Sequence, residues 1–133
     1  GTCISTRALL PDALLFGAEP DGADDAARSL ELGEFQPQIS PETICDGLLT
    51  SMGELTWPII KSHVEEIVRV SDEEVLIAMT MIHEIFGMAV EPSGAISLAA
   101  VLKDEFRSKE GIGSIGIILS GGNVDPEIFP SNP

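Results

Sequence analysis

Three stretches of the chain have the apolar pattern of β-strands. Residues 13–18 and 115–119 are short apolar runs without helical periodicity, which predicts two buried strands. Residues 66–70 alternate between polar and apolar side chains, as a strand with one buried face does. The last run stops at Ser120 and is followed by two glycines, which predicts that the strand ends in a turn.

Helical patterns lie between these strands. In the clearest one, Ser71 can cap a helix that has Glu74 three residues later, and apolar residues then recur at spacings of three and four until Gly87. Further helices are predicted over residues 4–10, 24–32, 56–64 and 95–106, with one helical turn around residues 46–47. Strands that alternate with helices predict the α/β class, with a mostly parallel sheet and helices on both faces.

The composition fits one acidic domain. The 133 residues carry a net charge of −15, from 22 acidic and 7 basic side chains, which argues against nucleic acid and anionic membranes as partners. No apolar stretch approaches the roughly 18 residues of a spanning helix. Only Cys3 and Cys45 are present, so we expect a reduced, cytoplasmic protein. The start at Gly1, without Met, is expected for a fragment or a processed product.

Two familiar motifs are excluded by their context. Gly111, Gly113 and Gly116 match G-x-G-x-x-G but lead into a predicted strand, whereas a dinucleotide-binding motif follows a strand and opens a helix. His83 and Glu84 begin H-E-x-x-H, but Gly87 stands at its fifth position, so no zinc-protease site is predicted.

An acidic cluster follows the first predicted strand. Glu19, Asp21, Asp24 and Asp25 lie where that strand ends and the next helix begins. Carboxylate oxygens in a turn suit Mg²⁺ or Ca²⁺. Acidic residues are also favoured in the first turn of a helix, so helix capping is the alternative interpretation.

Ser120 occupies a second position of interest. In open α/β sheets, ligands bind in the crevice beyond the carboxyl ends of the strands. A hydroxyl there can donate or accept a hydrogen bond, and the two glycines after it allow a flat ligand to approach the backbone. A plain strand followed by a tight turn is the alternative.

Several motifs, taken together, resemble one family. They are Gly17-Ala18-Glu19-Pro20 with Ala23-Asp24-Asp25, Pro41-Glu42-Thr43-Ile44 with Asp46-Gly47, Thr56-Trp57-Pro58-Ile59-Ile60, Glu91-Pro92-Ser93-Gly94-Ala95, and Leu119-Ser120-Gly121-Gly122-Asn123-Val124-Asp125. This set resembles the C-terminal part of the fold-type II enzymes of pyridoxal phosphate, in the branch of the serine racemases and threonine/serine dehydratases.

The resemblance implies a domain organisation and a set of cofactor residues. Residues 1–125 would form the C-terminal part of the large cofactor-binding domain, and residues 126–133, which are rich in proline, would be a disordered tail. In this family the serine after the last strand bonds the pyridine nitrogen of pyridoxal phosphate. The residues that the resemblance places at the cofactor are Ser120, Gly47, Glu91 and Gly121, with Asp46 facing the substrate and Asn123 near a nucleotide effector. A helix cap is the alternative role for Glu91.

The resemblance also implies a metal site. Glu19, the backbone carbonyl of Ala23 and Asp25 match the family's ligands for Mg²⁺ or Ca²⁺, and Mn²⁺ is a further candidate. Gly87 stands where mammalian serine racemases have a nucleotide-binding lysine, so activation by ATP does not carry over.

The function implied is that of a serine racemase, which interconverts L- and D-serine and also eliminates water from serine to give pyruvate and ammonia. The lysine that binds the cofactor lies N-terminal in this family, and Lys61, Lys103 and Lys109 match no such motif. We therefore expect this chain alone to be inactive. Expected partners are an amino-acid substrate (serine or threonine), the N-terminal part of the same enzyme, and a second copy in a homodimer. The alternatives are a threonine/serine dehydratase and a non-catalytic module that binds a cation or dimerises.

Overall fold

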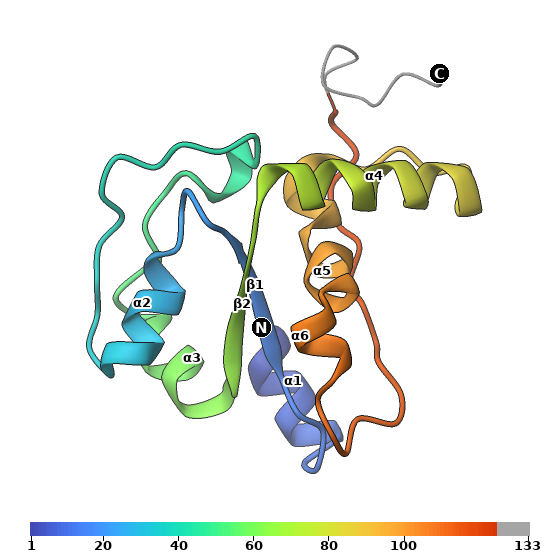
Figure 1. Cartoon of the computed structure of the whole chain (residues 1–133). Helices are drawn as coiled ribbons and strands as arrows, with labels where there is room; N and C mark the ends of the chain where they lie inside the picture. The colour runs from blue at the N-terminus through green and yellow to red at the C-terminus, as the bar shows by residue number, and fades with distance from the viewer. Residues whose placement is uncertain (125–133) are drawn as a thin grey trace.

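The computed structural model describes residues 1–124 (Figure 1). The predicted tail, residues 126–133, lies outside the described residues. The elements, in chain order, are helix α1 (Thr2–Leu9), strand β1 (Phe16–Pro20), helix α2 (Asp25–Leu32), the 3₁₀ helix η1 (Asp46–Leu48), helix α3 (Trp57–His63), strand β2 (Glu66–Val70), and helices α4 (Asp72–Phe86), α5 (Pro92–Leu102) and α6 (Asp104–Arg107).

The two strands form a parallel sheet at the centre of the molecule. Phe16 pairs with Glu66 at one end, and Pro20 pairs with Val70 at the other. Figure 1 shows α2 and α3 on one side of this sheet and α5 on the other. The predicted α/β class, with a parallel sheet and helices on both faces, is confirmed.

Helix α4 forms as its sequence predicts. The Glu74 N–H donates to Ser71 Oγ at 3.2 Å, and the Ser71 N–H donates to Glu74 Oε2 at 2.8 Å, which completes the capping box. The helix ends at Gly87, whose φ of 65° is a left-handed conformation that glycine adopts without strain. The residues that α4 buries are Val75, Ala78, Met79 and Ile82.

The core lies between the sheet, α4 and α5. Val68 and Val70 from β2 are buried with the apolar face of α4 and with Ala95 and Ala99 of α5. The small residues of α5 allow this helix to pack closely against its neighbours. The ring of Phe106 in α6 packs edge-on against Phe16 of β1, with 5.0 Å between ring centroids.

The prediction of a buried strand over residues 115–119 is wrong for the described part of the chain. This stretch forms no strand, and Ile115 and Ile118 are 47 % and 62 % exposed. A strand needs a neighbour for its backbone hydrogen bonds, and β1 and β2 pair only with each other. Within the described residues, the apolar run therefore has no partner strand.

Two element boundaries also differ from the predictions. The first strand covers Phe16–Pro20, not residues 13–18, so Glu19 and Pro20 belong to the strand and not to the turn after it. The helix predicted over residues 95–106 begins at Pro92 and is interrupted at Lys103, whose backbone is extended. Nζ of Lys103 donates to the carbonyl of Arg69 at 2.9 Å, which ties this break to β2. In the described part of the chain, no helix is both long and apolar enough to cross a lipid bilayer.

Candidate functional site

Three segments that are distant in the sequence meet beyond the carboxyl ends of the strands. They are η1, the first turn of α5 and the turn formed by residues 120–123. The N–H of Gly47 in η1 lies 3.1 Å from Ser93 Oγ in α5 and donates to it. The next residue, Gly94, packs directly against the carbonyl of Ser120. Therefore η1 and the turn, which hold predicted cofactor residues, both contact the first turn of α5.

Gly94 determines how closely the turn approaches α5. A Cβ atom at this position would lie 1.4 Å from the carbonyl oxygen of Ser120. No side chain fits in that space, so the contact requires glycine. Gly94 thereby fixes the position of Ser120 relative to the start of α5.

Glu91 holds the turn from the other side. The Asn123 N–H donates to Glu91 Oε2 at 3.3 Å, and the Glu91 N–H donates to the carbonyl of Gly121 at 3.4 Å. Gly121 has a φ of 67°, and a Cβ there would lie 2.1 Å from the carboxyl carbon of Glu91. Glu91 occupies the cap position of α5, but its side chain makes no capping hydrogen bond. The Glu91 carboxylate therefore bonds the turn and does not cap α5.

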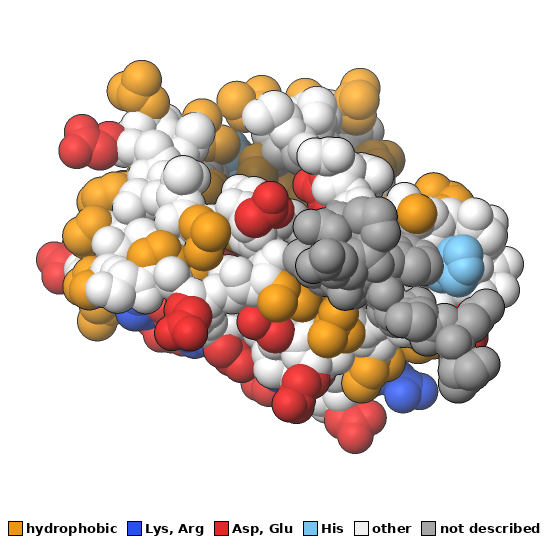
Figure 2. Space-filling model, turned by 90° about the horizontal axis from the view of Figure 1, so that it is seen from above, with side chains coloured by type: hydrophobic (Ala, Val, Ile, Leu, Met, Phe, Trp, Pro, Cys, Tyr) orange, Lys and Arg blue, Asp and Glu red, His pale blue; other side chains and the backbone are white. Residues whose placement is uncertain are grey.

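The side chains offered to a ligand at this end are exposed. Ser120 and Asp46 are both exposed, and Asp46 Oδ1 accepts the N–H of Gly47 at 2.8 Å. The Ser120 hydroxyl is therefore not sealed in apolar packing. In Figure 2, which views the molecule from above, acidic side chains are prominent on this face and basic ones are sparse.

Sequence reasoning overlooked the role of Ser93. Its hydroxyl accepts the N–H of Gly47 and so links η1 to α5. A Cβ at Gly47 would lie 3.0 Å from Ser93 Oγ, so this approach is also tight. The Pro-Ser-Gly sequence at the start of a helix was the available signal, because serine is common where it can bond backbone groups.

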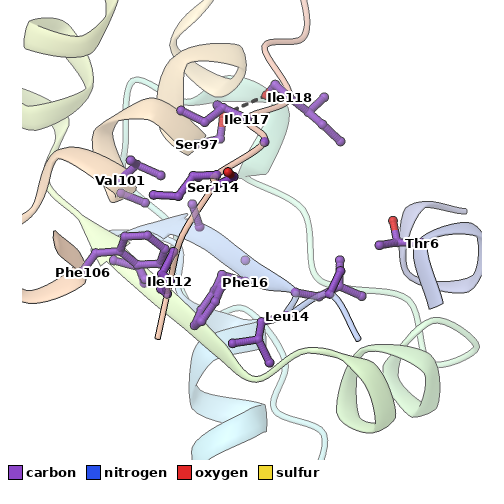
Figure 3. Close-up of a pocket in the computed structure, with 18 of the residues that line it drawn as sticks. Thr6, Leu14, Phe16, Ser97, Val101, Phe106, Ile112, Ser114, Ile117 and Ile118 are labelled. Carbon is purple, nitrogen blue, oxygen red and sulfur yellow. Dashed lines mark hydrogen bonds between the residues drawn. The ribbon is translucent and has the colours of Figure 1, made fainter. Parts of the chain in front are cut away.

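A hollow among the described residues lies elsewhere. It has a volume of about 690 Å³ and is lined by β1 and by residues 111–118 (Figure 3). Ser120, Gly47 and Glu91 do not line it. The hollow is therefore a separate feature from the predicted cofactor residues.

The acidic cluster divides into two parts. Asp25 is buried and Glu19 is partly buried, whereas Asp24 accepts hydrogen bonds from Arg28 at 2.8 Å and Arg69 at 2.9 Å. Burial alone would raise the pKa of Asp24, but the hydrogen bonds from the two arginines lower it. Asp21 is exposed. Glu19 and Asp25, the two predicted side-chain ligands of a metal, are therefore distinct from Asp24, which forms ion pairs with two arginines.

Glu19 has an unusual environment for a carboxyl group. Its oxygens accept the N–H groups of Ala26 at 3.2 Å and Ala27 at 2.8 Å, so it caps α2 from outside the helix. Burial raises its pKa to about 7, and the neighbouring charges of Asp25 and Asp24 contribute to the rise. The helix-capping interpretation is correct for Glu19. Its raised pKa also means that ionising the carboxyl costs free energy in the folded chain, and a bound cation would reduce that cost.

Asp25 is held by the long loop between α2 and α3. It is 3 % exposed and accepts the Met52 N–H at 2.6 Å and Nε2 of Gln38 at 3.2 Å. Ala23, whose carbonyl is the third predicted ligand, is also buried. Within residues 1–124, no group of three or more His, Cys, Asp or Glu side chains is placed to hold a metal. A site here would consist of two carboxylates and a backbone carbonyl.

Comparison with known proteins gives a consistent result. Residues 1–121 match the model of the family described as pyridoxal-phosphate dependent enzyme. A serine racemase of Dictyostelium discoideum is 49% identical over 127 residues, and a beta-hydroxyaspartate dehydratase of Paracoccus denitrificans is 40% identical over 134 residues. The structure of maize serine racemase superposes with a TM-score of 0.91 at 43% identity over 95% of this chain.

These matches extend over much more of this chain than of its relatives. The match to the Dictyostelium protein covers 94% of this chain but 39% of that protein, and the match to the maize structure covers 39% of that chain. The match to the Paracoccus protein covers 99% of this chain and 41% of that protein. The chain therefore spans about two fifths of the length of the relatives it matches.

Proposed function

The chain belongs to the pyridoxal-phosphate dependent enzymes, and from this premise we propose that it is the C-terminal part of a serine racemase with serine dehydratase side activity. The observation that carries the proposal is the meeting of η1, the start of α5 and the Ser120 turn, which brings together residues predicted to surround the cofactor. The relatives named serine racemase support the substrate class.

In this proposal, Ser120 faces the ring nitrogen of the cofactor. When bound, pyridoxal phosphate supplies an electron sink for the electrons released at the α-carbon of an amino acid. A neutral hydroxyl at Ser120 would leave the ring nitrogen unprotonated. The cofactor would then withdraw electrons less strongly than with a protonated ring. Glu91 and Gly94 would hold the turn in place, and Asp46 would lie toward the substrate.

The test uses a chimaera in which this chain replaces the matched 127 residues of the Dictyostelium serine racemase. Ser120→Asp should lower D-serine formation at least about tenfold, equivalent to about 1.4 kcal/mol in the barrier, because a carboxylate would keep the ring nitrogen protonated. Ser108→Asp, at an exposed position after α6, is the matched control. Equal racemase rates in both variants would refute the role of Ser120.

A dehydratase is the second candidate. A threo-3-hydroxyaspartate ammonia-lyase of Pseudomonas is 42% identical over 134 residues, a level close to that of several serine racemases. If the chimaera releases ammonia from threonine or hydroxyaspartate faster than it forms D-serine, this candidate replaces the first. D-serine as the main product would exclude it.

The proposal includes a divalent cation held by Glu19, the carbonyl of Ala23 and Asp25. The raised pKa of Glu19 supports this cation site, because a cation would offset the cost of charging this partly buried carboxyl. Calorimetric titration with Mg²⁺ and Ca²⁺ should give binding heat that Asp25→Asn removes and that exposed Asp21→Asn leaves unchanged. No heat for the parent chain would refute the site. Binding heat together with an inactive chimaera would favour a non-catalytic, cation-binding module.

A homodimer and a cytoplasmic location complete the proposal. Cys3 and Cys45 are free thiols, as is usual in a reducing compartment. Light scattering of the chimaera should give the mass of a dimer, and a monomer at micromolar concentration would contradict this part.

A further inference from the structure

The segment that leads into η1 is bound by the first turn of α4. Oδ1 of Asp72 accepts the hydroxyl proton of Thr43 at 2.5 Å, and Oδ2 accepts the N–H of Ile44 at 3.1 Å. Figure 1 shows this segment at the top of the molecule, beside the start of α4. Because both carboxylate oxygens of Asp72 are engaged, the contact fixes the orientation of the segment as well as its distance from α4.

The place of Asp72 in its own helix does not explain these partners. Asp72 is the first residue of α4, where an acidic side chain is favoured by the helix dipole. The capping box of Ser71 and Glu74 already binds the N–H groups at this end of the helix. Within residues 1–124, the hydrogen bonds of the Asp72 carboxylate all go to residues 28 and 29 positions earlier in the chain. Its side chain thus acts across the fold.

The residues between this contact and Gly47 have little freedom. Thr43 Oγ1 accepts the N–H of Cys45 at 3.2 Å, and the carbonyl of Ile44 accepts the N–H of Asp46 at 3.0 Å. The side chain of Cys45 is buried in the core. Since each residue from Thr43 to Asp46 is held by at least one of these contacts, a shift at Thr43 must also move η1.

The far end of the segment depends on a contact that tolerates little movement. The N–H of Gly47 donates to Ser93 Oγ of α5 at 3.1 Å. A donor and acceptor about 3.6 Å apart no longer form a hydrogen bond, so a displacement of roughly 0.5 Å is enough to break this contact. The position of η1 relative to α5 is therefore sensitive to whatever holds the residues before it.

A second anchor of the same segment is a competing explanation. The N–H of Glu42 donates to the carbonyl of Gly22 at 3.0 Å, and a Cβ at Gly22 would lie 1.8 Å from the carbonyl oxygen of Glu42. This contact places the chain immediately before Thr43. It leaves the direction of the chain after Thr43 open, and the Asp72 carboxylate is the group that binds the next two residues.

We propose that Asp72 is a positioning residue for Gly47, and that it acts through Thr43 to hold η1 against Ser93. Asp72 itself contacts none of the predicted cofactor residues in the described part of the chain. The placement of η1 is a property of this chain and is tested on the chain as it stands. Only its consequence for cofactor binding rests on the proposed function.

The test compares two substitutions of Thr43 by NMR. Thr43→Val keeps a branched side chain but removes the hydroxyl, whereas Thr43→Ser keeps the hydroxyl. The nuclear Overhauser effect between the Gly47 amide proton and the β-protons of Ser93 should fall at least twofold in Thr43→Val and stay at the parent intensity in Thr43→Ser. Thr80→Val is the matched control, because Thr80 Oγ1 bonds the carbonyl of Leu76 within α4 at 2.9 Å.

Asp72→Asn tests the same contact from the side of α4. A carboxylate accepts on both oxygens, whereas an amide has one accepting oxygen and an NH₂ donor, so it cannot accept from both Thr43 and Ile44. The Gly47–Ser93 effect should therefore weaken in this variant as well. Asp104→Asn, which removes an exposed carboxylate from the first turn of α6, is the control for a simple effect of helix-end charge and should leave the signal unchanged.

Three results would overturn the proposal. Full signal in folded Thr43→Val and Asp72→Asn would mean that other contacts, such as that of Gly22 with Glu42, place η1. An equal loss in Thr43→Ser would mean that side-chain size and not the hydroxyl is required. If neither Thr43→Val nor Asp72→Asn folds, the pair supports the whole fold, and a specific positioning role is refuted.

A measurement on the chimaera separates this inference from the proposed function. With both correct, Thr43→Val in the chimaera should raise the dissociation constant of pyridoxal phosphate at least fivefold, and Thr43→Ser should leave it unchanged. If the Gly47–Ser93 signal falls as expected while cofactor affinity stays constant, the placement of Gly47 at the cofactor is wrong. The role of Asp72 in placing η1 would still be supported by the result on the chain.

Discussion

The carboxyl group of Glu19 is the clearest case of a single residue whose charge opposes the fold. Its pKa rises from 4.5 to about 7 on folding, mainly through burial, so the folded chain binds more protons than the unfolded chain between these values. The resulting stability is complete below pH 4.5 and is lost as the pH rises through 7. With about 1.4 kcal/mol per unit of pKa, reduced by solvent screening, the loss should be about 2 kcal/mol.

Glu19→Gln should remove this pH-dependent contribution, so the free energy of unfolding should fall less steeply as the pH rises. Urea unfolding of both proteins from pH 5 to pH 8, with a chelator present, measures it. Identical slopes for parent and variant would show that Glu19 is charged at no cost in the folded chain. Added Ca²⁺ should stabilise the parent most at pH 8, where the carboxylate is ionised, and the variant much less.

The close contact between Gly94 and the Ser120 carbonyl can be tested by a single substitution. Gly94→Ala places a methyl group where the carbonyl of Ser120 lies, so either the turn or the start of α5 must move. We expect a loss of about 1–3 kcal/mol in the free energy of unfolding and a shift of the amide resonances of Ser120 and Gly121. Gly113→Ala, where a Cβ meets nothing within 4 Å, is the control. Equal losses in the two variants would contradict the close approach.

Among the elements, α4 is specified almost entirely by local sequence, and its cap can be tested. Ser71→Ala removes the acceptor of the Glu74 N–H and should lower the free energy of unfolding by about 1 kcal/mol. Ser62→Ala, at the exposed end of α3, should cost less than about 0.5 kcal/mol. Chemical denaturation compares the two, and a similar loss in both would mean that the capping box is not a significant source of stability.

The contrast between α4 and residues 115–119 explains what the sequence could predict. The signals of α4, a cap, a period and a terminal glycine, lie within the element, so its bounds were predicted closely. The apolar run of residues 115–119 has the composition of a strand, but a strand exists only with a neighbour, and none of the described residues supplies one. Likewise, the cofactor motifs were identified one by one, whereas Ser93 matters only because η1 folds back onto α5.

At the scale of the whole molecule, the residues predicted to serve the cofactor and the metal gather at one end of the sheet. The Ser120 turn and the Glu19–Asp25 pair lie at the carboxyl ends of the strands. Leu119 and Val124, which flank the turn, pack against the same core as both strands. The described residues leave apolar side chains such as Leu14 and Ile115 exposed.

Each of the three lysine side chains forms its hydrogen bonds away from the Ser120 turn. Nζ of Lys61 donates to the carbonyl of Gly33 at 2.6 Å, Lys103 binds Arg69 and Glu74, and Lys109 pairs with Glu66 at 2.6 Å. Within residues 1–124, no hydrogen bond of these lysine side chains reaches η1, the first turn of α5 or the Ser120 turn, so none of the three is in position to bind the cofactor covalently. Mixed with one equivalent of pyridoxal phosphate, the chain alone should not develop the visible absorption of a lysine imine, whereas the chimaera should. Absorption by the chain that Lys61→Arg abolishes would reveal adventitious surface reaction, and absorption that Ser120→Asp abolishes would mean that one of these lysines reaches the site after all.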